Sequence, residues 1–275
     1  MRSRLRISTS RAGPVMIRAI VRVLALGVAL GTGRALAADM PPQIDQTYAV
    51  YSHGFRVLAI AARYSVTPTG YAVRATMKSG GLMGLLFHMN ITSQATGRFV
   101  ADGVQPLTYD SAGFSRGADR HVVMAYDDGR ARIALQTPPE TGRDPIPSDD
   151  MAPAVDSLSA LMRLQQAVRT RHACDGSAVV FDGARLLRME ARTIGTEQMP
   201  DDSHQPYHGM ALRCDFSDVQ IAGFRRSDGP DSPARRPILG SVWFQDAQGN
   251  GETAVRIVFD HPKLGRLAVM LRPQE

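Results

Sequence analysis

The chain has 275 residues, with 32 lysines and arginines against 26 aspartates and glutamates, a formal net charge of +6. Seven of the arginines lie in residues 1–37, which hold no acidic residue, so 25 basic side chains face 26 acidic ones in the remainder. The basic balance belongs to the N-terminal segment, so it gives no indication that the rest binds nucleic acid or anionic lipid, and we expect no nucleic-acid partner.

Residues 1–37 have the order of a secretory signal peptide. Scattered arginines come first, the short apolar run VLALGVAL follows at 23–30, and Ala35-Leu36-Ala37 offers a small-x-small cleavage site. The apolar run is too short to span a bilayer, and no cysteine follows it for a lipid anchor. We therefore expect an exported, soluble chain of residues 38–275 that does not span the membrane.

Residues 45–137 predict a first group of strands. Apolar and polar residues alternate over 71–78, which is typical of a strand with one solvated face. Further strands are expected at 47–52, 55–66, 89–100, 105–114, 121–126 and 130–137. Asp128-Gly129 predicts a tight hairpin turn between the last two, because this dipeptide tolerates positive φ.

An apolar stretch, SGGLMGLLF at residues 79–87, interrupts these strands. One interpretation is a short turn or helix that closes the end of a β core. The other is an exposed lip that binds a lipid, a lipoprotein or an envelope protein. The second makes ligand-binding candidates of Leu82, Met83, Leu85, Leu86 and Phe87.

A proline-rich stretch at 138–153 and a helix at about 156–171 connect the two groups of strands. Asp156 is a favourable N-cap, and Leu158, Leu161, Leu164 and Val168 recur at helical spacing. A single apolar stripe indicates a helix packed on a sheet, with a partner-binding or membrane helix as the alternative. Strands resume over 173–275, one of them at 185–193, so we expect one mostly β domain of curved antiparallel sheets, arranged as a sandwich or a barrel.

Cys174 and Cys214 are the two cysteines of the chain. In an exported protein an isolated pair is most simply a disulfide. A free, reactive or metal-binding pair is the alternative, but no further ligands stand at zinc spacing.

Other motifs carry little chemistry. Gly113 to Gly117 matches the G-x-S-x-G elbow of serine hydrolases around Ser115, but a strand is expected to follow where the elbow needs a helix. His204 and His208 have an i, i+4 spacing, but Pro206 between them forbids a regular helix. We predict no metal site and no cofactor, while a pair of carboxylates for sugar chemistry stays open.

Several short sequence motifs, taken in their order along the chain, resemble those of a bacterial family called domain of unknown function 3108. The match covers nearly all of residues 38–275. The motifs are YAVY at 48–51, GGLMGLLF at 80–87, YDDGR at 126–130, TPP at 137–139, DSLSAL at 156–161, CDG at 174–176, FDG at 181–183, LRC at 212–214 and IAGF at 221–224. The resemblance implies an exported, β-rich protein of Gram-negative bacteria with no assigned activity. The chain is also distantly similar to periplasmic envelope-integrity proteins built as a β-spiral of two half-barrels with a helix.

The combined expectation is a non-enzymatic periplasmic protein of the cell envelope. It would bind or scaffold an envelope lipid, lipoprotein or protein through a concave β surface, or carry an apolar ligand in a deep cavity. The alternative is a hydrolase of an envelope polymer or ester that uses Ser115 or a carboxylate pair.

Overall fold

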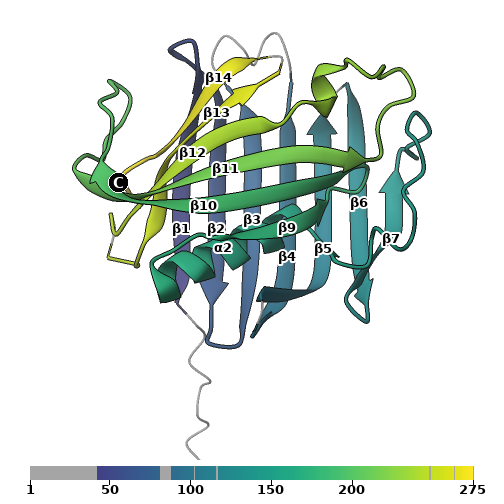
Figure 1. The fold of residues 1–275 in the computed structure, drawn as a ribbon, viewed down its shortest axis with the longest axis horizontal. Helices are drawn as coiled ribbons and strands as arrows, with labels where there is room; N and C mark the ends of the chain where they lie inside the picture. The colour runs from purple at the N-terminus through teal and green to yellow at the C-terminus, as the bar shows by residue number, and fades with distance from the viewer. Residues whose placement is uncertain are drawn as a thin grey trace, which may run out of the picture. The chain divides into compact units, whose positions relative to one another are not determined.

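A computed structural model describes residues 42–80, 88–101, 103–115, 117–247, 249–262 and 264–274. The alternating segments pair into one sheet of fourteen strands in the described chain, in the order β7-β6-β5-β4-β3-β2-β1-β14-β13-β12-β11-β10-β9-β8 (Figure 1). The sheet curls until its two end strands, β7 and β8, come into contact. The residues expected to form a barrel of curved antiparallel strands therefore do so, as a nearly closed barrel.

The first half of the sheet is an antiparallel meander. Its strands are β1 (Gln43–Ser52), β2 (Phe55–Val66), β3 (Gly70–Ser79), β4 (Asn90–Val100), β5 (Gly103–Ser115), β6 (Ala118–Asp127) and β7 (Arg130–Thr137). Asp128 and Gly129 both have positive φ, at 48° and 78°, in the turn between β6 and β7. The hairpin predicted from this dipeptide is confirmed.

The second half begins with a short strand that lies parallel to its neighbour. Its strands are β8 (Ala154–Val155), β9 (Gly176–Phe181), β10 (Leu186–Gln198), β11 (Met210–Ala222), β12 (Ile238–Gln245), β13 (Thr253–His261) and β14 (Gly265–Leu271). A single 3₁₀ turn, η1 (Pro233–Arg235), precedes β12 in this part of the described chain. The two halves join where β1 pairs with β14, with Tyr48 opposite Leu271.

The predicted helix is α2 (Ser157–Arg171). The Asp156 carboxylate accepts a hydrogen bond from the backbone N–H of Ser159, as an N-cap does, and His172 ends the helix in the left-handed conformation. The helix contacts β4 and β5 of the first half and β9 of the second, so it lies between the two halves of the sheet. No helix in the described ranges is long and apolar enough to cross a bilayer.

The apolar stripe of α2 is buried at its ends but not in its middle. Leu158 and Val168 are buried, whereas Leu161 is 49% exposed and Leu164 is partly exposed. The expectation that the whole stripe packs on the sheet is thus wrong for the middle turn. There Leu161 and Leu164 border an open space, while Met162 on the same turn is buried in the core.

Candidate functional site

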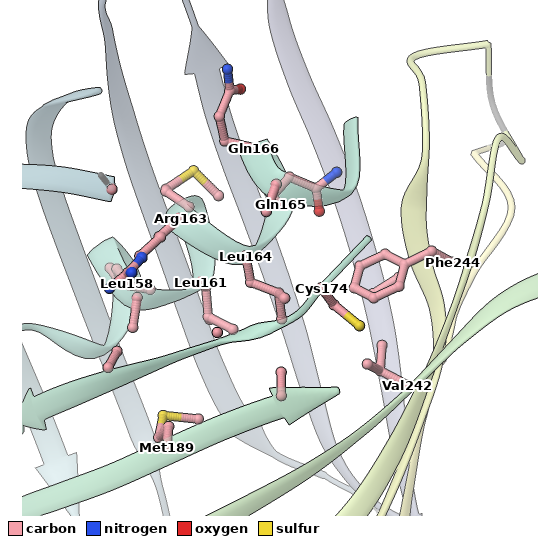
Figure 2. Close-up of a pocket in the computed structure, with 18 of the residues that line it drawn as sticks. Leu158, Leu161, Arg163, Leu164, Gln165, Gln166, Cys174, Met189, Val242 and Phe244 are labelled. Atoms are coloured by element: carbon pink, nitrogen blue, oxygen red, sulfur yellow. The ribbon is translucent and has the colours of Figure 1, made fainter. Parts of the chain in front are cut away.

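The space beside α2 is a cavity of about 970 Å³ within the barrel (Figure 2). Its wall comes from the inner faces of strands in both halves and from α2 itself. The apolar part includes Ile60 and Val73 from the first half, and Met189, Val242, Phe244 and Ile257 from the second. Such a wall suits the apolar part of a small molecule.

The two sides of α2 present different chemistry to this cavity. Leu161 and Leu164 point toward the strand that carries Met189, whereas Gln165 and Gln166 project from the other side of the helix (Figure 2). The Gln165 side chain donates a hydrogen bond to the backbone carbonyl of Glu252. The glutamine side of α2 is thereby tied to the strand end where β13 begins.

A buried polar cluster, formed by Gln46, Tyr48, Tyr64 and Thr253, lies at that end. Gln46 is 5% exposed, Tyr64 5% and Thr253 2%. The Gln46 amide nitrogen donates to the Tyr64 hydroxyl at 2.9 Å and to Thr253 Oγ1 at 3.1 Å. The Gln46 amide oxygen accepts from the Tyr48 hydroxyl at 2.8 Å. Three of these four residues, all but Thr253, also line the cavity.

Burial raises the pKa of Tyr48 and of Tyr64, because a phenolate loses its hydration when it is taken out of water. Both phenols therefore keep their protons at neutral pH. The cluster acts through neutral hydrogen bonds, as donors and acceptors of fixed position.

A second buried network holds the N-terminal end of α2. Asp156 is fully buried, and its carboxylate accepts from Tyr126 Oη at 3.0 Å, Ser159 Oγ at 2.6 Å and Ser159 N at 2.8 Å. Tyr71 in turn donates to Ser159 Oγ at 2.7 Å. Strands β3 and β6 are thus hydrogen-bonded to the first turn of the helix.

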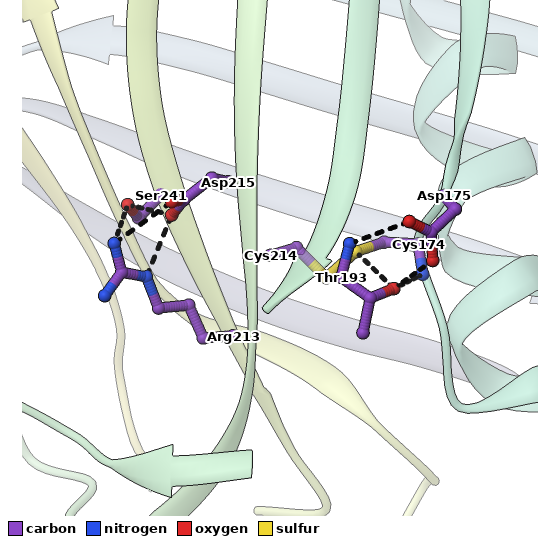
Figure 3. Close-up of a disulfide and its surroundings, with 7 residues drawn as sticks. All are labelled: Cys174, Asp175, Thr193, Arg213, Cys214, Asp215 and Ser241. Carbon is purple, nitrogen blue, oxygen red and sulfur yellow. Dashed lines mark hydrogen bonds and ion pairs between the residues drawn. A yellow bond between two sulfur atoms is a disulfide. The ribbon is translucent and has the colours of Figure 1, made fainter. Parts of the chain in front are cut away.

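The C-terminal end of α2 is fixed covalently. Cys174 and Cys214 have their sulfur atoms at bonding distance, 2.09 Å, as predicted for the pair (Figure 3). The backbone N–H of Cys174 donates to Thr193 Oγ1 at 2.9 Å, and that hydroxyl donates to the Asp175 carboxylate. His172 Nδ1 lies 2.7 Å from the carboxylate of Glu252. Both ends of α2 are therefore held, while its middle borders the cavity.

Ser115 is the last residue of β5, and the next element is the strand β6, which begins at Ala118. A nucleophile elbow requires a helix after the strand, so the motif does not have the required context. The nearest His–Asp pair, His121 with Asp110 at 3.1 Å, does not serve Ser115. Asp110 lies five positions before Ser115 in an uninterrupted register and therefore faces the other side of the sheet.

His204 and His208 lie in the loop between β10 and β11, as expected of a polar segment. The His204 ring packs against Tyr51, with centroids 4.2 Å apart, and its Nδ1 lies 3.3 Å from Asp202. No group of three or more metal-ligating side chains occurs among the residues that the structure describes.

The proposed apolar lip, Leu82, Met83, Leu85, Leu86 and Phe87, lies outside the described residues. The polar cluster was missed at the sequence level, although the sequence contains a signal for it. Gln46 stands in the apolar phase of β1, between Ile44 and Tyr48, where alternation predicts an apolar side chain.

These observations define a β-barrel-like protein with an internal cavity beside a fixed helix. The chain belongs to the family described as protein of unknown function (DUF3108), whose model matches residues 47–270. Among solved structures it is similar to a beta-barrel-like protein of domain of unknown function DUF1849 from Brucella abortus. That similarity has 13% sequence identity and a TM-score of 0.43, and it covers 85% of this chain and 96% of the other. No curated protein matches the chain.

Proposed function

We propose that this protein is a non-enzymatic binding protein of the bacterial cell envelope that holds an apolar ligand in the cavity beside α2. The main support for this proposal is the open cavity of about 970 Å³, whose wall is apolar on the leucine side of the helix. Its volume lies at the upper end of the roughly 300–1,000 Å³ range of small-molecule sites.

The energetics of Leu161 support this proposal. Its side chain lines the cavity and points toward the strand that carries Met189, and it is 49% exposed (Figure 2). Burial of a leucine side chain is worth about 1.5–3 kcal/mol, so an apolar ligand that covers Leu161 and Leu164 recovers part of that free energy. Both ends of α2 are anchored, so the helix is held in place beside the cavity.

Two features favour the periplasm as the place of action. The basic-apolar-small order of residues 1–37 predicts export. The bond between Cys174 and Cys214 is of a kind that persists in oxidising compartments. A periplasmic carrier of envelope lipid is consistent with both features, and a scaffold for a protein partner is the competing role.

The test replaces Leu161 by glutamate and measures binding of diphenylhexatriene, a purely apolar fluorescent probe. An unpaired carboxylate in an apolar wall is costly, so we expect the Kd to rise about tenfold or more. The fold should tolerate the change, because half of the Leu161 surface is already exposed.

The matched control is Leu239→Glu, since Leu239 is 59% exposed and does not line the cavity. We expect this variant to bind the probe as the parent does. Equal loss of binding in the two variants, or no probe binding by the parent, would contradict the carrier proposal and favour the scaffold.

A further inference from the structure

The barrel contains a second cavity, of about 600 Å³, which the proposed function does not use. It lies at the end of the barrel where β5 and β7 finish, and the turn between β9 and β10 forms its opposite wall. That turn is held against the sheet, because the Gln136 side chain donates to the Gly183 carbonyl at 2.7 Å and Gly183 packs on Val122. Among the described residues, the two cavities share no lining residue.

Arg120 lines this second cavity from β6. It stands on the same face of the strand as Met124, which is buried in the core. Its partner across the ladder is Gly113 of β5, so no side chain covers it from that strand. The Arg120 Nε atom donates to the Ser115 carbonyl at 3.3 Å, and this is the one hydrogen bond of its side chain in the described chain. The two terminal nitrogen atoms of the guanidinium therefore remain available to a ligand.

The carboxylates that line the second cavity in the described chain are engaged by other arginines. Asp182 accepts from Arg185 Nε at 2.8 Å and from Arg185 Nη2 at 2.6 Å. Glu140 Oε2 lies 3.4 Å from the Nε of the buried Arg143. Arg120 thus carries the excess positive charge of the cavity wall. A guanidinium with free N–H groups suits a carboxylate or a phosphate, because its planar fork matches two oxygen atoms.

Ser115 supplies a second donor beside this guanidinium. It is 7% exposed and lines the cavity, two positions after Gly113 and thus on the same face of β5. Its backbone carbonyl accepts from Arg120, whereas its hydroxyl has no hydrogen-bond partner in the part of the chain that the structure describes. A buried hydroxyl without a partner costs free energy that an anion in the cavity would recover.

We propose that the second cavity binds a small organic anion, with its carboxylate or phosphate group held by Arg120 and Ser115. The apolar part of such a molecule would lie against Met89, Ile91 and Val122, which also line the cavity. The serine of the G-x-S-x-G match then acts as a hydrogen-bond donor and not as a nucleophile. This site is independent of the apolar ligand proposed for the cavity beside α2.

Isothermal titration calorimetry with benzoate and with phenyl phosphate tests the site on the full chain at low ionic strength. We expect the parent to bind at least one of the two anions. Arg120→Gln removes the charge and should raise that Kd by about tenfold or more. Ser115→Ala removes one hydrogen bond and should raise it by about three- to tenfold.

The matched control is Arg130→Gln, which makes the same change of charge on the neighbouring strand β7. Arg130 is exposed and lines neither cavity, so its loss should leave the Kd of both anions as in the parent. Benzyl alcohol, a neutral molecule of similar size, should bind the parent at least about tenfold more weakly than the anion does. Equal urea denaturation midpoints for Arg120→Gln and the parent show that the variant keeps its fold.

The outcomes identify the anion or overturn the site. Binding of benzoate alone assigns a carboxylate, binding of phenyl phosphate alone assigns a phosphate, and binding of both supports the shared anionic chemistry. The inference is wrong if the parent binds neither anion, if benzyl alcohol binds as tightly, or if Arg120→Gln and Ser115→Ala both keep the Kd of the parent. None of these results affects the apolar carrier, which the diphenylhexatriene experiment tests at a different cavity.

Discussion

Replacement of Cys214 by serine is expected to lower the free energy of unfolding by about 4 kcal/mol. The bond joins residues 40 positions apart and so removes much of the loop entropy of the unfolded chain. Cys214 is fully buried and Cys174 nearly so, in one cluster with Val168 of α2 and with Val242 and Phe244 of the cavity wall. Urea denaturation of the oxidised parent and of the variant measures the difference.

Two comparisons make this prediction specific. Cys174→Ser and the double variant should lose about the same free energy as Cys214→Ser, because each removes the same covalent link. Addition of reductant should weaken the parent and leave the variants unchanged. Equal denaturation midpoints for the parent and Cys214→Ser would show that the bond does not support the fold.

The Asp156→Ala variant is expected to lose about 3 kcal/mol of stability. The substitution removes the N-cap of α2, worth about 1 kcal/mol, and leaves Tyr126 and the Ser159 hydroxyl without their acceptor in a buried place, worth about 1 kcal/mol or more each. Asp156→Asn keeps a capping oxygen and should lose about 1 kcal/mol. Asp150→Ala, at an exposed position, is the surface control.

If Asp156→Ala and Asp150→Ala denature at the same urea concentration, the buried network does not hold the helix. Far-ultraviolet circular dichroism at low urea shows whether any loss is confined to α2 or extends to the whole barrel.

Asp156 also makes the stability depend on pH. Burial raises the pKa of this carboxyl above its ordinary value of 3.8, so the folded protein retains a proton that the unfolded chain has already released. Its contribution to stability is therefore complete below pH 3.8 and is lost as the pH rises through the raised folded pKa. The parent should lose stability relative to Asp156→Asn over that window, and a constant difference would contradict the assignment.

The sequence predicts the local elements well, because each carries its own signal. Asp156 and the leucine spacing define α2 before any tertiary contact is known, and Asp128-Gly129 defines its hairpin. The end of β10 is predicted less accurately. The sequence predicts a strand at 185–193, whereas β10 continues to Gln198. The register shifts between Thr193 and Gly195, so the strand bends there and does not stop.

The cavity depends on how distant elements pack together, and the local periodicity of the sequence does not predict it. Leu161 and Leu164 belong to the same apolar stripe of α2 as the buried Leu158 and Val168. Only the position of α2 between the half-barrels decides which of these four side chains are buried. One partner of Gln46, Thr253, is 207 positions away, so no local pattern predicts that hydrogen bond. The only local signal of the polar cluster is Gln46, a polar residue at a position of β1 where alternation predicts an apolar one.

The most direct test of the account is native mass spectrometry of the full chain purified without detergent, as isolated and after incubation with excess palmitic acid. We expect an added mass of lipid size in at least one state, released on denaturation and reduced in Leu161→Glu. A bare protein mass in both states would contradict the claim that the cavity beside α2 holds an apolar ligand.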